Sequence, residues 1–176
     1  MSLLLEPNCY FIEGDLLDFP RDIEVIMHQA NTENCMRSGI AAQIVKRFPQ
    51  MQMADELFYR RNAGTNRLGQ ISYADGVFDG KLRRGINLYG QTLTPIKGVY
   101  TQYRYLSEAL YKANHMCRIW QRDKPLRVGI PYLMGCDIAR GSWDKVERLV
   151  ADAFAQSLRH HTMELYVVSL PKKNQK

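Results

Sequence analysis

The sequence lacks the features of a secreted, membrane-spanning or disulfide-stabilised protein. Its four cysteines, Cys9, Cys35, Cys117 and Cys136, form no CxxC pair and no metal-ligand spacing, so we expect reduced thiols in a reducing compartment. No apolar stretch approaches the roughly 20 residues that a membrane span needs. The apolar run near the N-terminus is too short for a signal-peptide core. The expectation is a soluble, cytoplasmic protein with no metal site.

Linkers, repeats and two common nucleotide-binding motifs are also missing. The chain contains neither the GxxxxGK[ST] of a P-loop nor a GxGxxG, which weakens ATPase and Rossmann interpretations. Without a Gly/Ser linker or an internal repeat, its 176 residues predict one domain over 1–176, with 170–176 as a flexible tail. We expect a monomer, because no exposed apolar stripe remains once the helices have packed.

The charge balance favours an anionic partner without identifying it. Lys and Arg outnumber Asp and Glu by 24 to 18, which gives a net charge of +6. Such an excess attracts nucleic acid and nucleotide phosphates alike. The small clusters at Arg60-Arg61, Arg83-Arg84 and Lys172-Lys173 are interpreted as solvated surface. No basic stripe or aromatic stacking platform is visible, so a domain that only binds nucleic acid is a distant alternative.

Apolar periodicity predicts strands and helices that alternate along the chain. Strands are expected at 9–13, 24–29, 68–77, 85–89, 126–133 and 163–170, and helices at 38–48, 51–61, 103–120 and from Ser142 onward. Ser38 and Ser142 are the expected N-caps, and Ala54, Leu57 and Phe58 the apolar side of the second helix. This alternation is typical of an α/β fold, with a mostly parallel or mixed sheet covered on both faces.

Two loops have the character of ligand-binding loops, because each follows a buried strand and precedes a helix. In the first, Gly39 lets the backbone approach a ligand, and the helix behind it offers free N–H groups to an anion. Asn31 in the same loop suits ribose hydroxyls, or it bonds its own backbone as a turn residue. In the second loop, 135–141, successive N–H groups can form a concavity for a diphosphate.

These segments together resemble a macrodomain. The resemblance runs in order from about Tyr10 to Leu170, and three blocks carry it: Glu13-Gly14-Asp15-Leu16-Leu17 with Val25-Ile26-Met27-His28-Gln29-Ala30-Asn31, then Met36-Arg37-Ser38-Gly39-Ile40-Ala41, then Gly135-Cys136-Asp137-Ile138-Ala139-Arg140-Gly141-Ser142-Trp143. The His-x-x-Asn and Met-x-x-Gly-Ile-Ala motifs match best the subgroup of ADP-ribose-1''-phosphate phosphatases and terminal ADP-ribose glycohydrolases. The implied fold is a three-layer α/β/α macrodomain with a mixed, mostly parallel central sheet.

The resemblance also implies a set of ligand-binding residues. Asp15 is expected at the adenine amino group with the Leu16 backbone nearby, and Asn31 at the distal ribose. Two walls are expected to hold the diphosphate: Ser38, Gly39 and Ile40 on one side, and Gly135, Cys136, Asp137, Ile138 and Ala139 on the other. The implied ligand is ADP-ribose or ADP-ribose-1''-phosphate, without any further cofactor.

The chemistry performed on this ligand is left open by the sequence. The glycohydrolases of the subgroup use a lysine and an aspartate where this chain has Gln91 and Ala139, and an amide is no nucleophile. Lysine-dependent cleavage would need Lys97 from the following loop. The phosphatase interpretation survives, with His28 or Asp137 as candidate catalytic residues. For His28 the alternative is a structural histidine, and for Asp137 a backbone cap.

Three functions therefore remain. The first is hydrolysis of ADP-ribose-1''-phosphate. The second is removal of ADP-ribose from protein or nucleic acid, where the positive charge mildly favours nucleic acid. The third is a non-catalytic ADP-ribose reader, which Gln91 and Ala139 would suit.

Overall fold

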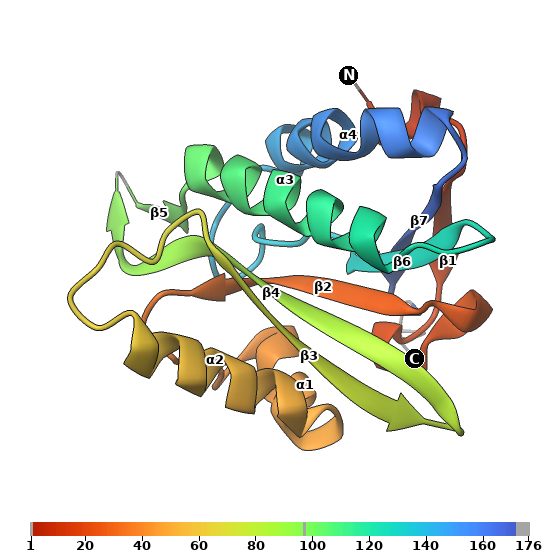
Figure 1. Ribbon diagram of the computed structural model, residues 1–176. Coiled ribbons are helices and arrows are strands. Elements are labelled where there is room, and N and C mark those ends of the chain that lie inside the picture. Colours follow the sequence, from red (N-terminus) through yellow and green to blue (C-terminus); the bar gives the residue numbers. More distant parts are fainter. Residues whose placement is uncertain (1, 97, 172–176) are drawn as a thin grey trace, which may run out of the picture.

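The computed structural model describes residues 2–96 and 98–171 and has a single mixed sheet at its centre (Figure 1). The sheet has seven strands in the order β1-β7-β6-β2-β4-β3, and β5 pairs with β4 beside this path. The strands are β1 (Cys9–Glu13), β2 (Val25–Asn31), β3 (Ile71–Phe78), β4 (Lys81–Ile96), β5 (Val99–Thr101), β6 (Leu126–Pro131) and β7 (Met163–Ser169). Strands β1, β7, β6, β2 and β4 run parallel, whereas β3 and β5 are antiparallel to β4.

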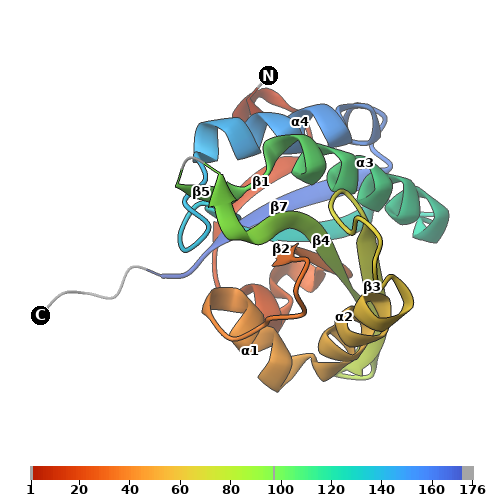
Figure 2. The ribbon, with the colours of Figure 1, turned by 90° about the vertical axis from the view of Figure 1, so that its left-hand side faces the viewer.

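Helices cover both faces of this sheet. They are α1 (Gly39–Arg47), α2 (Pro49–Arg61), α3 (Tyr103–Trp120) and α4 (Trp143–Arg159). Figure 2 shows α3 and α4 together on one face and α1 and α2 on the other. The apolar core is correspondingly divided into two clusters, one on each side of the sheet. This arrangement confirms the α/β class and the mostly parallel sheet expected from the sequence.

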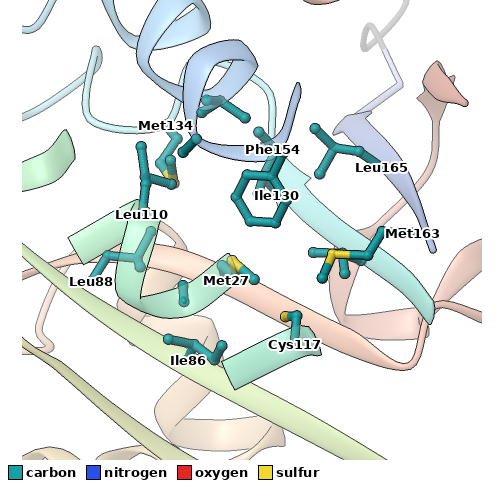
Figure 3. Close-up of a cluster of buried hydrophobic side chains, with 14 of the residues drawn as sticks. Met27, Ile86, Leu88, Leu110, Cys117, Ile130, Met134, Phe154, Met163 and Leu165 are labelled. Atoms are coloured by element: carbon teal, nitrogen blue, oxygen red, sulfur yellow. The ribbon is translucent and has the colours of Figure 1, made fainter. Parts of the chain in front are cut away.

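The larger cluster shows why the apolar runs of the sequence become buried strands. Its strand residues meet the apolar stripes of α3 and α4 (Figure 3), and they include Met27, Ile86, Leu88, Ile130 and Leu165, opposite Leu110, Cys117 and Phe154. Strands buried on both faces have continuous apolar runs in the sequence, as at 165–168. Among the described residues, no helix is both long and apolar enough to cross a membrane.

Several element boundaries differ from the prediction. The strand expected at 68–77 begins only at Ile71, and the one expected at 85–89 is part of the much longer β4. Strand β5 was not predicted, because three residues carry too little pattern. Ser38 and Ser142 are N-caps by position, but neither side chain makes the expected capping hydrogen bond. Of the tail expected at 170–176, residues 172–176 lie outside the described part.

The apolar side of α2 was predicted correctly only in part, because Phe58 stacks on Tyr89 and Ala54 is half-buried, whereas Leu57 is exposed. The helix begins at Pro49, which a first helical turn tolerates. Leu57 is 48% exposed, whereas Asp55 is buried. The reason is a hydrogen bond across the layer, because the Tyr89 hydroxyl donates to Oδ1 of Asp55 at 2.7 Å. A partner on β4 therefore holds a carboxylate where the sequence pattern favours an apolar side chain.

This bond belongs to a buried chain of polar contacts that joins α2 to the sheet. Asn87 Nδ2 donates to the Met51 carbonyl and to Ser72 Oγ, each at 3.0 Å. Ser72 Oγ lies 2.8 Å from the Tyr89 hydroxyl. Ser72 is the donor in this contact, because the Tyr89 hydroxyl donates its hydrogen to Asp55. Burial raises the pKa of Asp55, so the Tyr89 hydroxyl compensates a desolvated carboxyl group.

Replacing Tyr89 with phenylalanine is expected to lower the free energy of unfolding by about 1–3 kcal/mol, because Asp55 and Ser72 lose their shared partner while staying buried. Urea unfolding followed by circular dichroism measures the change. Tyr111→Phe, at an exposed position of α3, is the matched control and should change stability little. Equal stability of Tyr89→Phe and the wild type would contradict this role.

Candidate functional site

A cleft of about 790 Å³ lies at the carboxyl ends of β2 and β6, the edge of a parallel sheet where ligands of α/β proteins bind. Every binding residue expected from the sequence lines it: Asp15, Leu16, Asn31, Ser38, Gly39, Ile40, Gly135, Cys136, Asp137, Ile138 and Ala139. Leu170, assigned to the tail by the sequence, also lines it. A second hollow of about 530 Å³ lies between α3 and α4 and shares no residue with the cleft.

One wall of the cleft is the N-terminus of α1. Ser38 precedes the helix with extended backbone and no side-chain cap, and Gly39 has a φ of +55° that favours glycine. Among the described residues, the backbone N–H groups of 39–41 have no hydrogen-bond partner. We call them the helix amides. They carry the partial positive charge of the helix N-terminus and are suited to an anion.

The opposite wall is the loop between β6 and α4. Its backbone turns at Leu133, Gly135 and Arg140, which all have positive φ. Turn hydrogen bonds occupy the N–H groups of Cys136 and Arg140, whereas those of 137–139 find no partner in the part of the chain that is described. We call these three the loop amides. Consecutive unpaired N–H groups in such a turn form a concave anion site.

The two walls approach each other at Gly39. A Cβ placed on Gly39 would lie 3.7 Å from Cδ1 of Ile138, so the Ile138 side chain reaches the start of α1. The same Ile138 is 54% exposed. Two sets of unpaired amides from opposite faces of the sheet therefore border one cleft.

Two hydrogen bonds hold the Asp15 side chain, which lines the cleft, in place. Its Oδ1 accepts from the Leu17 N–H at 2.9 Å and caps the 3-10 turn η2 (Leu16–Asp18). Its Oδ2 accepts from Nη1 of Arg47 at 2.6 Å. Each carboxylate oxygen has a second lone pair, so Asp15 can still accept a ligand N–H. The Leu16 N–H, beside it, has no partner among the described residues.

Asn31 lines the cleft and also closes the turn behind it. Its Oδ1 accepts from the N–H groups of Glu33 at 2.9 Å and Cys35 at 3.3 Å, and its Nδ2 donates to the Cys35 carbonyl at 2.7 Å. This is the turn function that the sequence left as the alternative. One Nδ2 hydrogen remains for a ligand.

His28 is not brought into the cleft. It is fully buried on β2, and its Nε2 lies 2.7 Å from Oδ1 of Asn87, its neighbour on β4. Since Oδ1 is only an acceptor, the Nε2–H donates. Burial lowers the pKa of His28 to about 4. The sequence could not supply this partner, because it depends on the register between β2 and β4. The position corresponds to the structural histidine that the sequence left as the alternative.

Asp137 and Cys136 lie in the cleft with different chemistry. Asp137 is exposed, and its carboxylate has no hydrogen-bond or ion-pair partner among the described residues. The Cys136 thiol donates to the Met134 carbonyl at 3.3 Å, and burial raises its pKa to about 11. The thiol is therefore protonated near neutral pH and is no nucleophile. Ala139 offers only backbone, and Lys97 lies outside the described residues.

The floor of the cleft holds two carboxamides, of which Gln29 was missed as a site residue. Gln29 Nε2 donates to Oε1 of Gln91 at 3.2 Å and to Oγ1 of Thr101 at 2.9 Å. The Gln91 Nε2 has no partner among the described residues. Strand alternation gives a signal for Gln29, because residues two apart share a face and Asn31 already belonged to the expected site.

Comparisons with known proteins agree on the fold. No protein-family model matches the chain. A curated relative, an uncharacterized 17.5 kDa protein of Enterobacteria phage T4, is 27% identical over 150 residues, which are 84% of this chain and 90% of the relative. The macrodomain of Mycobacterium tuberculosis DarG is 24% identical, with 93% and 98% of the two chains covered and a TM-score of 0.72. Thermosipho africanus DarTG in complex with ADP-ribose is 13% identical with a TM-score of 0.70, and it aligns with all of this chain and 44% of its own.

The protein therefore has the macrodomain fold, as the motifs at its two loops predicted.

The placement of His28 predicts how stability depends on pH. Its pKa in the folded protein is about 4, below the ordinary 6.5, so the unfolded chain binds the additional proton between these values. The free energy of unfolding should therefore fall as the pH decreases from 6.5 to 4, by at most about 1.4 kcal/mol per pH unit.

Urea unfolding at several pH values should give a flatter profile for His28→Gln than for the wild type. His115→Gln, at an exposed position, should keep the wild-type slope. Parallel profiles for all three proteins would refute the assignment.

Proposed function

We propose that the cleft binds ADP-ribose or a derivative of it, with the diphosphate between the helix amides and the loop amides. The observation that carries this proposal is the pair of unpaired amide sets, 39–41 and 137–139, on opposite walls of one cleft. Two phosphate groups need many hydrogen-bond donors, and backbone amides supply them without a metal or a lysine. The ADP-ribose complex of the similarly folded Thermosipho africanus DarTG supports the choice of ligand.

The remaining residues divide between the two ends of the ligand. Asp15 and the free N–H of Leu16 suit the adenine, whose amino group donates and whose ring nitrogens accept. At the other end, Asn31 keeps one amide hydrogen and Gln91 an unpaired amide group. These neutral donors suit ribose hydroxyls. The cleft thus offers a complementary partner for each part of ADP-ribose.

The reaction that we favour is hydrolysis of ADP-ribose-1''-phosphate to ADP-ribose and phosphate. In this scheme Asp137 accepts a proton from a water molecule, which attacks the phosphorus while the bond between the phosphorus and the ribose oxygen breaks. That oxygen takes up a proton from solvent. Asp137 is favoured over His28 because it lines the cleft with a carboxylate that is not engaged in the described part of the chain.

A non-catalytic reader of ADP-ribose is the second candidate. The floor of the cleft favours it, because Gln29 and Gln91 are neutral amides and Ala139 has no functional group. A glycohydrolase acting on ADP-ribosylated protein or nucleic acid would need a nucleophile or base that these three positions lack. Binding of ADP-ribose without release of product from any of these substrates would identify a reader.

Calorimetric titration with ADP-ribose tests binding, and Asp15 provides the sharpest variant. Asp15→Asn is expected to weaken ADP-ribose binding about tenfold, because a neutral amide is a poorer acceptor than a carboxylate. Asp18→Asn is the matched control, since Asp18 also pairs with Arg47 but does not line the cleft. Its affinity should equal that of the wild type. Weakening by both variants alike would point to Arg47 rather than to the adenine.

Asp137→Asn separates catalysis from binding. Phosphate release from ADP-ribose-1''-phosphate should fall about 100-fold or more, the usual contribution of a general base. Affinity for ADP-ribose should stay equal or increase, because a negative charge beside the diphosphate is removed. Asp144→Asn on α4, outside the cleft, controls for the change in net charge. Unchanged turnover in Asp137→Asn would remove Asp137 from the mechanism, and no turnover by the wild type would leave the reader.

A further inference from the structure

The loop that carries the loop amides is closed at a narrow neck. The Gly141 N–H donates to the Gly135 carbonyl at 2.9 Å, so the two ends of 135–141 lie side by side. A Cβ on Gly141 would be only 2.4 Å from that carbonyl oxygen, which explains the glycine. The Gly135 carbonyl is the point where the loop is closed.

The same carbonyl is bonded to β5. Thr101 Oγ1 donates to the Gly135 carbonyl at 2.7 Å and accepts from Gln29 Nε2 at 2.9 Å. The Tyr100 and Thr101 N–H groups both point to the Ala139 carbonyl, at 3.0 and 3.3 Å. Strand β5 therefore holds the segment 135–139 at both of its ends.

Gln29 completes this contact from the floor of the cleft. A Cβ on Gly135 would lie 2.6 Å from Gln29 Oε1 and 3.1 Å from its Nε2, so the carboxamide packs flat against Gly135. Gln29 is 9% exposed and Thr101 3%. We call Gln29, Thr101, Gly135 and Gly141 the neck network.

We propose that Thr101 is a positioning residue, which through the neck network holds the loop amides in the geometry that a diphosphate requires. The inference rests on the proposed function for its ligand, but Thr101 itself does not line the cleft. A single hydroxyl is suited to this place, because it accepts from Gln29 and donates to Gly135 at once. Loop amides ordered in advance spare the ligand the entropic cost of ordering them.

Thr101→Val tests this role, because valine keeps the shape of threonine but can make neither hydrogen bond. We expect ADP-ribose to bind at least about tenfold more weakly in calorimetry, while adenosine, which has no phosphate, keeps its wild-type affinity in an NMR titration. Thr101→Ser restores the hydroxyl and should bind ADP-ribose within about threefold of the wild type. Thr162→Val is the matched control, since it removes a threonine hydroxyl bonded to the Ser157 carbonyl, away from the cleft. That variant should keep the ADP-ribose affinity.

A second variant disturbs the network without changing Thr101. Gly135→Ala should show the same selective loss, because its methyl group would meet Gln29 and its φ of +72° disfavours alanine. In addition, hydrogen exchange of the Gly141 N–H, which is bonded to the Gly135 carbonyl, should be faster without ligand in Thr101→Val than in Thr162→Val.

The outcomes separate the two proposals. A wild type that does not bind ADP-ribose would reject the proposed function, and unchanged exchange of the Gly141 N–H would reject the positioning role independently. If the wild type binds ADP-ribose and Thr101→Val binds it equally well, only the positioning role is rejected. Equal weakening for adenosine and ADP-ribose would also overturn it, because the effect would then be one of general stability.

Discussion

The site depends on backbone N–H groups that have no hydrogen-bond partner in the described part of the chain. The first N–H groups of a helix have no intrahelical acceptor, and a tight turn can also leave N–H groups without one. These groups belong to a helix start, at 39–41, and to a turn, at 137–139, and both sets border the same cleft. An oxyanion is the natural acceptor for such groups. The parallel sheet makes this possible, because the loops that follow β2 and β6 emerge at the same edge.

Most of the side chains around these amides hold other groups in place and are not themselves reactive. Asp15 is fixed by Arg47, Gln29 by Thr101, and the Gly135 carbonyl by both Thr101 and Gly141. Reactive groups are scarce by comparison, since Cys136 is held protonated and His28 is buried away from the cleft. Asp137 is the exception at the rim. The cleft therefore combines backbone N–H groups on two walls with one carboxylate, Asp137, that has no partner in the described part of the chain.

The sequence predicted best those features that depend on residues close together in the chain. Gly39 and Gly135 were expected at ligand-binding turns, and both adopt positive φ beside the cleft. The helix at 103–120 was predicted with its observed ends, because its apolar residues repeat at helical spacing and one buried face meets the core. The binding residues implied by the macrodomain resemblance all reached one cleft.

Sequence reasoning could not identify hydrogen-bond partners that only the tertiary fold brings together. The roles of His28 and Asp55 follow from Asn87 and Tyr89, which lie 59 and 34 positions away along the chain. Strand β5 is too short to leave a pattern, so the contact of Thr101 with the Gly135 carbonyl was not foreseen. Long-range hydrogen bonds of this kind leave no periodic signal, because each one joins residues that are far apart in the sequence.

The most direct test of the account is an amide-resolved NMR titration of the whole protein with ADP-ribose. Unpaired N–H groups that gain phosphate acceptors should show saturable downfield shifts, so the resonances of 39–41 and 137–139 are expected to move most and together. Shifts confined to other parts of the molecule, or unmoved resonances for both sets at millimolar ADP-ribose, would contradict the account.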